Sequence, residues 1–163
     1  MKKISILLSF LFIATLTMAQ SEYKAHNEGW LVKIEEAYKE SKQTGKPIMA
    51  NFTGSDWCGW CKRLTASVFS KPEFKSWAED NVVLLELDFP RRTQLPNDIR
   101  QQNYSLQQAF KVRGYPTIWV FHLDKNEQGQ FAIQALGRTG YTPTVEQFTS
   151  GVDQMIARAD KGE

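Results

Sequence analysis

The only two cysteines of this 163-residue chain, Cys58 and Cys61, are separated by Gly59 and Trp60. Two thiols at this spacing can close a small disulfide and reopen it reversibly. If they stand at the start of a helix, the unpaired N–H groups and the helix dipole stabilise the first sulfur as a thiolate. The thiolate attacks disulfides, so we predict that Cys58 is the nucleophile and that Cys61 resolves the mixed disulfide.

Two other uses of the cysteine pair stay open. One is a purely structural disulfide, although closing a four-residue loop removes little chain entropy. The other is a metal carrier for copper or zinc, but the chain has only two histidines, His26 and His122. Neither histidine has metal-ligand spacing to another candidate ligand. We therefore expect redox exchange, with no metal and no cofactor at the site.

The residues around the cysteines predict a strand that leads into a helix. Residues 47–53 form an apolar run typical of a buried strand, and residues 62–69 are compatible with a helix. Residues 82–87 form a second apolar run of strand length. Two buried strands separated by a helix predict a parallel βαβ unit, with the cysteines where the first strand meets its helix.

Helices are predicted before, between and after these strands. An apolar helical face precedes the first strand and consists of five residues: Trp30, Leu31, Ile34, Ala37 and Tyr38. Residues 70–73 predict a capping box, with Pro72 in the first turn of a short helix. Near the C-terminus, Thr142 is predicted to cap a last helix that has Pro143 at its first position. Apolar residues recur at helical spacing over 145–159.

The remaining segments complete an alternating order of helices and strands. Residues 89–103 are polar and contain two prolines, which predicts a loop or a partly helical excursion, and a helical turn follows at 106–110. A third strand is predicted at 116–121 and a fourth at 131–136. Because only a turn at 124–130 separates them, the third and fourth strands should be antiparallel.

The N-terminus has the features of a secretory signal peptide. Lys2 and Lys3 precede an apolar run over residues 4–16, and small residues stand before a cleavage point between Ala19 and Gln20. We therefore expect residues 1–19 to be a signal peptide and residues 20–163 to be a single exported domain with its core at about 30–159. The expected location is the periplasm, with secretion as the alternative.

The charge of the mature chain argues against two classes of partner. The whole chain has 20 Lys and Arg against 18 Asp and Glu, so removal of Lys2 and Lys3 leaves equal numbers. A near-neutral protein has no basic field to attract nucleic acid or an anionic membrane. We expect no nucleic-acid binding, no stable membrane association of the mature form, and a monomer.

Three segments together resemble the thioredoxin superfamily: residues 57–62 with the cysteines, residues 112–117, and the final strand pair with its helix. The resemblance implies an α/β thioredoxin-like fold, with a central mixed sheet of four to five strands and helices on both faces. In the family, the proline that matches Pro116 is cis and lies beside the active disulfide. The resemblance also implies a set of substrate-binding or supporting residues: Trp57, Gly59, Trp60, Tyr115, Pro116 and Thr117.

The resemblance implies a protein-disulfide oxidoreductase, for which we favour reductase or isomerase activity. Its substrates would be protein disulfides, and a membrane or exported thiol protein would donate electrons. A non-catalytic binding or chaperone module is the alternative. The chain departs from thioredoxin in three places: Gly59-Trp60 replaces Gly-Pro, residues 89–103 are longer, and Asn51 stands where thioredoxin has a buried aspartate.

Overall fold

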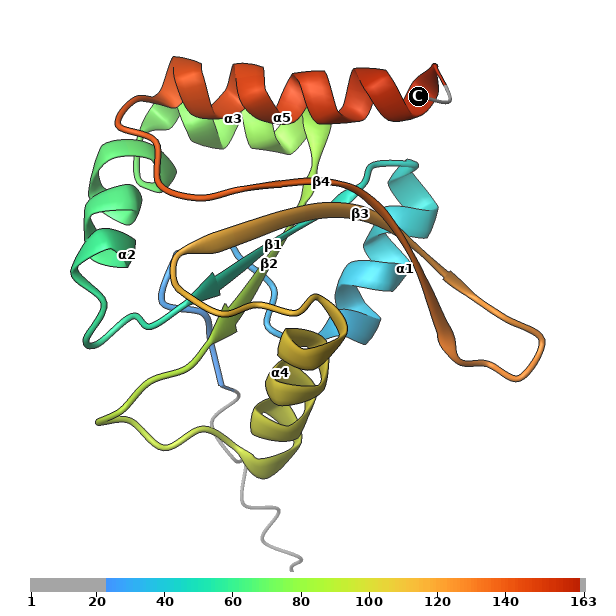
Figure 1. Ribbon diagram of the computed structural model, residues 1–163, viewed down its shortest axis with the longest axis horizontal. Helices are drawn as coiled ribbons and strands as arrows, with labels where there is room; N and C mark the ends of the chain where they lie inside the picture. Colours follow the sequence, from blue (N-terminus) through green and yellow to red (C-terminus); the bar gives the residue numbers. More distant parts are fainter. Residues whose placement is uncertain (1–22, 162–163) are drawn as a thin grey trace, which may run out of the picture.

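A four-stranded mixed sheet organises residues 23–161, which are the residues that the computed structural model describes (Figure 1). The predicted signal peptide lies outside this range. The spatial order is β2-β1-β3-β4, with bounds β1 Ile48–Thr53, β2 Val83–Asp88, β3 Thr117–Lys125 and β4 Phe131–Thr139. The β1–β2 pair is parallel, whereas β1–β3 and β3–β4 are antiparallel. The predicted parallel unit and closing hairpin are therefore confirmed.

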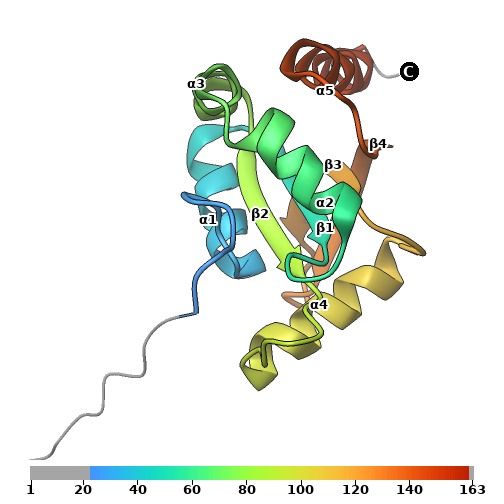
Figure 2. The ribbon, with the colours of Figure 1, turned by 90° about the vertical axis from the view of Figure 1, so that its left-hand side faces the viewer.

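Helices cover both faces of the sheet, as expected for the fold class (Figures 1 and 2). Their bounds are α1 Ile34–Thr44, α2 Gly59–Leu64, α3 Pro72–Asn81, α4 Asn97–Ala109 and α5 Val145–Asp160. A π-helical turn, Thr65–Phe69, continues α2. One core lies under α2, α3 and α5, and the other lies under α1 and the end of α4.

The strand β1 is buried along its whole length because it lies inside the sheet with a core on each face. Ile48, Ala50 and Phe52 pack into the core beneath α1, while Met49 packs into the opposite core. This two-sided burial explains why the strand is a continuous apolar run rather than an alternating one.

The first helix begins later than predicted. Trp30 and Leu31 were expected on its apolar face, but α1 starts at Ile34. Leu31 instead forms a parallel bridge with Leu85, and its backbone carbonyl accepts a hydrogen bond of 2.8 Å from the N–H of Glu86. Because β2 is an edge strand, its free backbone groups draw this segment into an extended conformation.

Both predicted helix caps were wrong by one or two residues. The N-cap of α3 is Lys71, with Pro72 as the first helical residue and no side-chain capping bond. Ser70 does not cap α3 because its hydroxyl donates back to the carbonyl of Ala66. At α5 the N-cap is Thr144 instead of Thr142, and its hydroxyl oxygen accepts from the N–H of Gln147 at 3.3 Å.

The polar segment at 89–103 proves to be half helix. Helix α4 begins at Asn97 and includes most of the helical turn predicted at 106–110. Only residues 89–96 remain irregular, between β2 and α4. The closing hairpin is also longer than predicted, because β3 continues to Lys125 and β4 to Thr139.

Candidate active site

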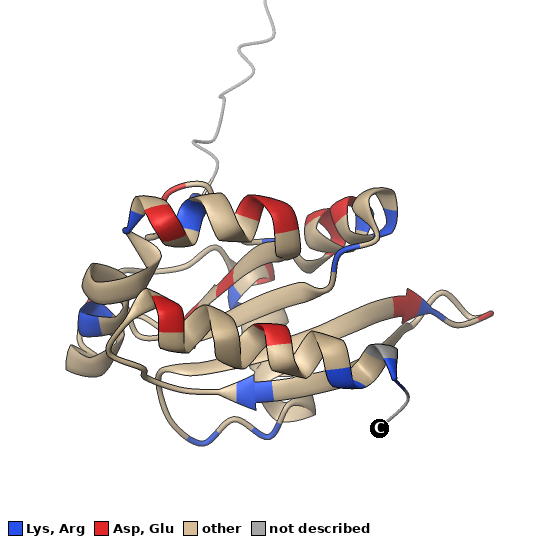
Figure 3. Cartoon of the chain, turned by 90° about the horizontal axis from the view of Figure 1, so that it is seen from above, with Lys and Arg blue, Asp and Glu red and all other residues tan. Residues whose placement is uncertain are grey.

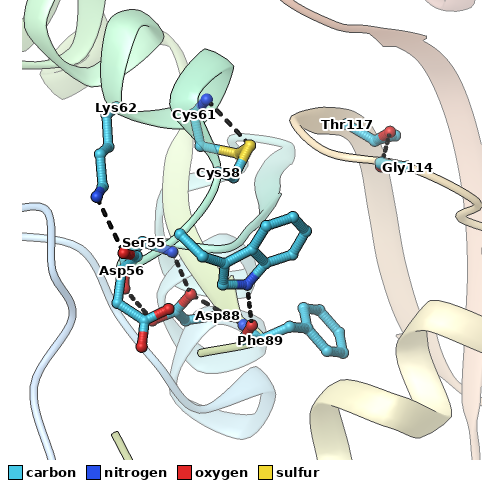
Figure 4. The surroundings of a disulfide bond; sticks show 10 residues. Ser55, Asp56, Cys58, Cys61, Lys62, Asp88, Phe89, Gly114 and Thr117 are labelled. Atoms are coloured by element: carbon cyan, nitrogen blue, oxygen red, sulfur yellow. Dashed lines mark hydrogen bonds between the residues drawn. A yellow bond between two sulfur atoms is a disulfide. The ribbon is translucent and has the colours of Figure 1, made fainter. Parts of the chain in front are cut away.

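Cys58 and Cys61 form a disulfide at the junction between β1 and α2 (Figure 4). Cys58 is the N-cap of α2, and its Sγ accepts a hydrogen bond of 3.2 Å from the N–H of Cys61. The first sulfur therefore occupies the position where a helix offers unpaired donors and partial positive charge. This is the placement that the sequence predicted for the nucleophile.

Both sulfur-bearing residues are nearly covered in this oxidised form. Cys58 is 6% exposed and Cys61 is 3% exposed, so the two residues differ little in accessibility. Lys62 follows on α2, but its ammonium group donates to the backbone carbonyl of Asp56 at 2.9 Å. Its charge thus helps to hold the loop that precedes the cysteines.

Gly54 shapes the loop between β1 and the cysteines. Its carbonyl accepts from the N–H groups of Trp57 at 3.2 Å and Cys58 at 2.8 Å. A Cβ atom at this position would lie 2.5 Å from the Trp57 ring, far inside van der Waals contact. Glycine is therefore required here for close approach by the indole.

The same loop is tied to the segment that follows β2. The carboxylate of Asp88 accepts from the N–H of Ser55 at 2.9 Å and from its hydroxyl at 2.5 Å. The Trp57 indole N–H donates to the carbonyl of Phe89 at 2.8 Å. Figure 4 shows these bonds grouped below the disulfide. Since β1 and β2 are parallel, their carboxyl ends meet at one edge, and this places Asp88 beside the cysteine loop.

Asp56 adds a second tie between the two segments. Its carboxylate accepts from the N–H groups of Arg91 at 3.0 Å and Arg92 at 2.6 Å. Burial opposes ionisation, but hydrogen bonds from the N–H groups of residues 91–93 outweigh it and hold the pKa of Asp56 below its ordinary value. Asp56 and Asp88 were not predicted as supporting residues of this site, although Asp88 ends a buried parallel strand and could have been noticed for that reason.

Trp57 and Tyr115 form an aromatic wall next to the cysteine loop. Their rings meet edge to face with centroids 5.8 Å apart, and the Arg91 guanidinium lies 3.8 Å above the Trp57 ring. Tyr115 also packs on Phe89, and its hydroxyl accepts from the Gln107 amide at 2.6 Å. Burial is the main cause that raises the pKa of Tyr115 to about 12. The Trp57 ring itself is half-buried, and contacts with Tyr115, Arg91 and Phe89 hold it in place.

The peptide bond between Tyr115 and Pro116 is cis, as the family resemblance implied. Thr117 begins β3 directly after it and pairs with Phe52 in β1. The Thr117 hydroxyl donates to the carbonyl of Gly114 at 2.8 Å, which closes the loop before the strand (Figure 4).

Trp60 provides exposed apolar surface between the two cysteines. Its side chain is 54% exposed, although Tyr141 lies 4.9 Å away and the Arg63 guanidinium lies 4.7 Å above the ring. Gly59, the first residue of α2, is exposed, and a Cβ atom added there would have nothing within 4 Å. Of the aromatic residues that the resemblance implied at the site, Trp60 is thus exposed, whereas Trp57 and Tyr115 are half-buried.

Asn51 is buried, and its side-chain oxygen is unsatisfied. It is 2% exposed, and no described residue bonds to its Oδ1. Glu86 lies opposite Asn51 in the strand register, yet its carboxylate accepts from Asn27, from the backbone at 3.0 Å and from the side-chain amide at 2.5 Å. Burial raises the pKa of Glu86, against the effect of these bonds. Its carboxylate is directed to the N-terminal segment.

Residues 23–161 contain neither a metal-binding cluster nor a membrane-spanning helix. No three His, Cys, Asp or Glu side chains gather in this range in a group that could hold a metal ion. None of the helices in this range is long and apolar enough to span a membrane. Acidic and basic residues are mixed over the face seen in Figure 3.

Comparison with known proteins connects this geometry to disulfide chemistry. The chain is 33% identical over 111 residues to the disulfide bond reductase DsbH of Chlamydia pneumoniae, covering 68% of this chain and 67% of that protein. It is 28% identical over 127 residues to the thioredoxin-related protein DsbJ of Chlamydia pneumoniae, covering 78% of this chain but only 36% of DsbJ.

Solved structures show the same fold. One described as a DsbH oxidoreductase aligns with a TM-score of 0.67 and 32% identity, over 85% of this chain and 92% of that structure. A thioredoxin from Thermus thermophilus aligns with a TM-score of 0.57 and 19% identity, over 80% of this chain and 89% of that structure. The family model for the thioredoxin-like domain matches residues 34–155, which include both cysteines, the cis proline and every strand described above. This chain therefore belongs to the thioredoxin-like domain family.

Proposed function

We propose that this protein is a thiol–disulfide oxidoreductase that reduces or isomerises protein disulfides through Cys58 and Cys61. The observation that carries the proposal is the position of Cys58 at the N-cap of α2, where its sulfur accepts the Cys61 N–H. A thiol in that position has a lowered pKa and a larger thiolate fraction near neutral pH. The related disulfide bond reductase supports the same chemistry.

The exchange proceeds in two steps that move two electrons from the protein to the substrate. The Cys58 thiolate attacks one sulfur of a substrate disulfide, which forms a mixed disulfide and releases the other substrate sulfur as a thiolate. The Cys61 thiolate then attacks the Cys58 sulfur, which forms the intramolecular disulfide and releases the second substrate thiol. An exported or membrane thiol protein reduces the pair again. In isomerisation, the released substrate thiolate instead attacks a second disulfide of the same substrate and displaces another substrate thiolate, which attacks the mixed disulfide and releases Cys58 as a thiolate, so no net electrons move.

Cys61 must lose its proton before it can attack. The Asn51 amide does not titrate near neutral pH, and the Glu86 carboxylate is bonded to Asn27. We propose that water or the departing substrate thiolate accepts the Cys61 proton in this protein.

The substrate polypeptide lies over the exposed Trp60 ring and along the Tyr115–Pro116 segment. Pro116 has no N–H and precedes the β3 ladder, so the backbone around it has groups that the sheet does not pair. An extended substrate can hydrogen-bond to such unpaired groups, as in strand-addition recognition. Thr117, at the start of β3, anchors this segment to the sheet. We propose that Gly59 leaves room for the substrate chain beside the sulfurs.

The signal peptide predicted at residues 1–19 supports the proposal that the protein acts outside the cytoplasm, in the periplasm or after secretion. Export also fits the cysteine chemistry, because disulfide substrates form and persist in oxidising compartments. We further propose that the mature domain, residues 20–163, works as a monomer.

Insulin reduction by the mature protein, with dithiothreitol as the electron source, tests this function. The wild type should accelerate reduction, and Cys58→Ser should abolish the acceleration. Cys61→Ser, reduced beforehand and freed of dithiothreitol, should accumulate mixed disulfides with insulin that are visible on non-reducing gels. Absence of turnover with a stable intramolecular disulfide would instead favour the binding-module alternative. Stoichiometric copper or zinc in the reduced protein would favour the metal carrier.

A further inference from the structure

A polar pocket lies next to the cysteine loop, in the segment that joins β2 to α4. Its volume is about 410 Å³. Residues 88–95 form one side, and Arg100, Asn103 and Tyr104 of α4 form the other. We call it the arginine pocket, because Arg91, Arg92 and Arg100 are three of its eleven lining residues. Figures 1 and 2 show this segment beside the loop that leads from β1 into α2.

The three guanidinium groups are not neutralised by ion pairs. Within residues 23–161, none of them lies within 4.0 Å of a carboxylate oxygen. Arg100 donates to the neutral side chain of Asn97 at 2.9 Å, and Arg91 lies on the Trp57 ring. Arg92 attracts the Asp56 carboxylate, but the hydrogen bond between these two residues comes from the Arg92 backbone.

The one acidic side chain that lines the arginine pocket is already occupied. The Asp88 carboxylate accepts from the N–H and hydroxyl of Ser55 and from the N–H of Phe89. Its oxygens are thus engaged on the side of the cysteine loop. The pocket consequently has an excess of positive charge with free donor capacity, although the mature chain as a whole is near neutral.

The arginine pocket is connected directly to the redox site. Phe89 lines the pocket, accepts the Trp57 indole N–H, and packs on Tyr115 at 5.2 Å between ring centroids. The Arg91 guanidinium lies over the Trp57 ring, and Trp57 immediately precedes Cys58. A polypeptide bound at Cys58 therefore has neighbouring residues within reach of the pocket.

We propose that the arginine pocket is a subsite for a carboxylate side chain of the disulfide substrate, a role that rests on the proposed thiol–disulfide exchange. Carboxylates are the anionic groups that an unmodified polypeptide carries, and the planar guanidinium fork matches them in two-point hydrogen bonds. Tyr104, 53% exposed and packed edge-on against Phe89, supplies an apolar wall for the methylenes of a glutamate. The pocket thus selects substrates with an acidic residue near the reactive cysteine.

Kinetics with matched cystine peptides test this inference. Two peptides that differ only in Glu or Gln beside the cystine are reduced by the wild type, Arg100→Gln, Arg92→Gln and the control Arg158→Gln. The control removes the same charge from the far end of α5. The wild type should favour the Glu peptide in kcat/KM by about three- to tenfold, the range for a charge-assisted bond at a partly exposed site. This ratio should fall toward one in both pocket variants and persist in Arg158→Gln.

The outcomes separate this inference from the function on which it rests. If neither peptide is reduced, thiol–disulfide exchange itself is wrong. If both are reduced at equal rates by the wild type, or if Arg158→Gln lowers the ratio as much as Arg100→Gln, the subsite is wrong while the function stands. High salt should also weaken the preference for Glu, because ions screen a partly exposed pair.

Discussion

At the scale of single residues, the site depends on a few positions where a small change in a side chain has a specific physical effect. Gly54 and Asn51 are two of them, and both precede the cysteines in the segment that includes β1. Gly54 allows the Trp57 ring to approach the backbone, and Asn51 puts an amide in a position buried beneath the helical layer.

Gly54→Ala should destabilise the protein by about 1–3 kcal/mol, as overpacking of a filled site does. The added methyl would lie 2.5 Å from the Trp57 ring, which its bond to Phe89 and its contact with Arg91 hold in place. Urea unfolding measures the loss. Gly151→Ala is the matched control: nothing lies within 4 Å of its Cβ, and alanine should stabilise α5 by about 0.5–1 kcal/mol. Equal effects of the two changes would contradict the packing argument.

Asn51→Asp should make resolution of the mixed disulfide faster, because a carboxylate could accept the Cys61 proton. Burial raises the pKa of such a carboxyl above the unfolded value of about 3.9. The variant should therefore match the wild type in stability below that pH and lose stability as pH rises through the folded value.

Stopped-flow Trp fluorescence and urea unfolding at several pH values check this prediction. Asn51→Leu, which removes the amide without adding an acid, is the control. It should show neither the faster resolution nor the pH-dependent loss of stability. If Asn51→Asp resolves at the wild-type rate and keeps a flat stability profile, Asn51 does not occupy the position of the thioredoxin acid.

At the scale of elements, the cysteine loop is held by the carboxyl end of the neighbouring strand. The parallel pairing of β1 and β2 brings Thr53 opposite Asp88, so the segment before Cys58 and the segment after β2 leave the sheet together. Asp88, Asp56 and Trp57 then join them through hydrogen bonds. The position of the cysteine loop thus depends on the segment after β2 as much as on α2.

Asp88→Asn should lower the free energy of unfolding by about 1–3 kcal/mol and loosen the cysteine loop. An amide offers one acceptor oxygen where the carboxylate now accepts two bonds from Ser55 and one from Phe89. Urea unfolding of the oxidised protein measures the loss. Asp124→Asn, which breaks an exposed pair with Lys42, should cost less than about 1 kcal/mol. Similar losses at both positions would argue against a special role for Asp88.

At the scale of the whole molecule, stability depends on a buried acid that joins the sheet to the N-terminal segment. Glu86 lies on the edge strand and accepts hydrogen bonds from His26 and Asn27. Its pKa is raised because burial disfavours the ionised form more than these bonds favour it. Its protonated form therefore suits the folded state better than its ionised form.

The free energy of unfolding, measured across the pH range, should reveal the titration of Glu86. Since the folded pKa of Glu86 lies above the unfolded value, its contribution is fully present below the unfolded pKa and is lost as pH rises through the folded one. The difference in unfolding free energy between wild type and Glu86→Gln should therefore change across that interval, as urea unfolding at a series of pH values would measure. A constant difference between about pH 4 and pH 8 would refute this expectation, since the interval begins near the ordinary carboxyl pKa.

The sequence by itself determined the order of the elements and the place of the cysteine pair among them. Cys58 and Cys61 stand between an apolar strand and a helix, and the runs at 47–53 and 82–87 predict a parallel pair, because periodicity and chain connectivity are local properties. The cis proline followed from the family resemblance rather than from the residues alone.

Only the tertiary structure decided which distant groups complete the site. Asp88 reaches Ser55 across 33 positions of sequence, and Leu31 leaves its predicted helix to pair with Leu85. The helix caps were also decided here, because the Ser70 hydroxyl bonds to Ala66 instead of capping α3, and Thr144 instead of Thr142 caps α5. The arginine pocket likewise forms where two segments meet. Side-chain hydrogen bonds between distant segments have no sequence period, so their partners are set by how the strands and helices pack.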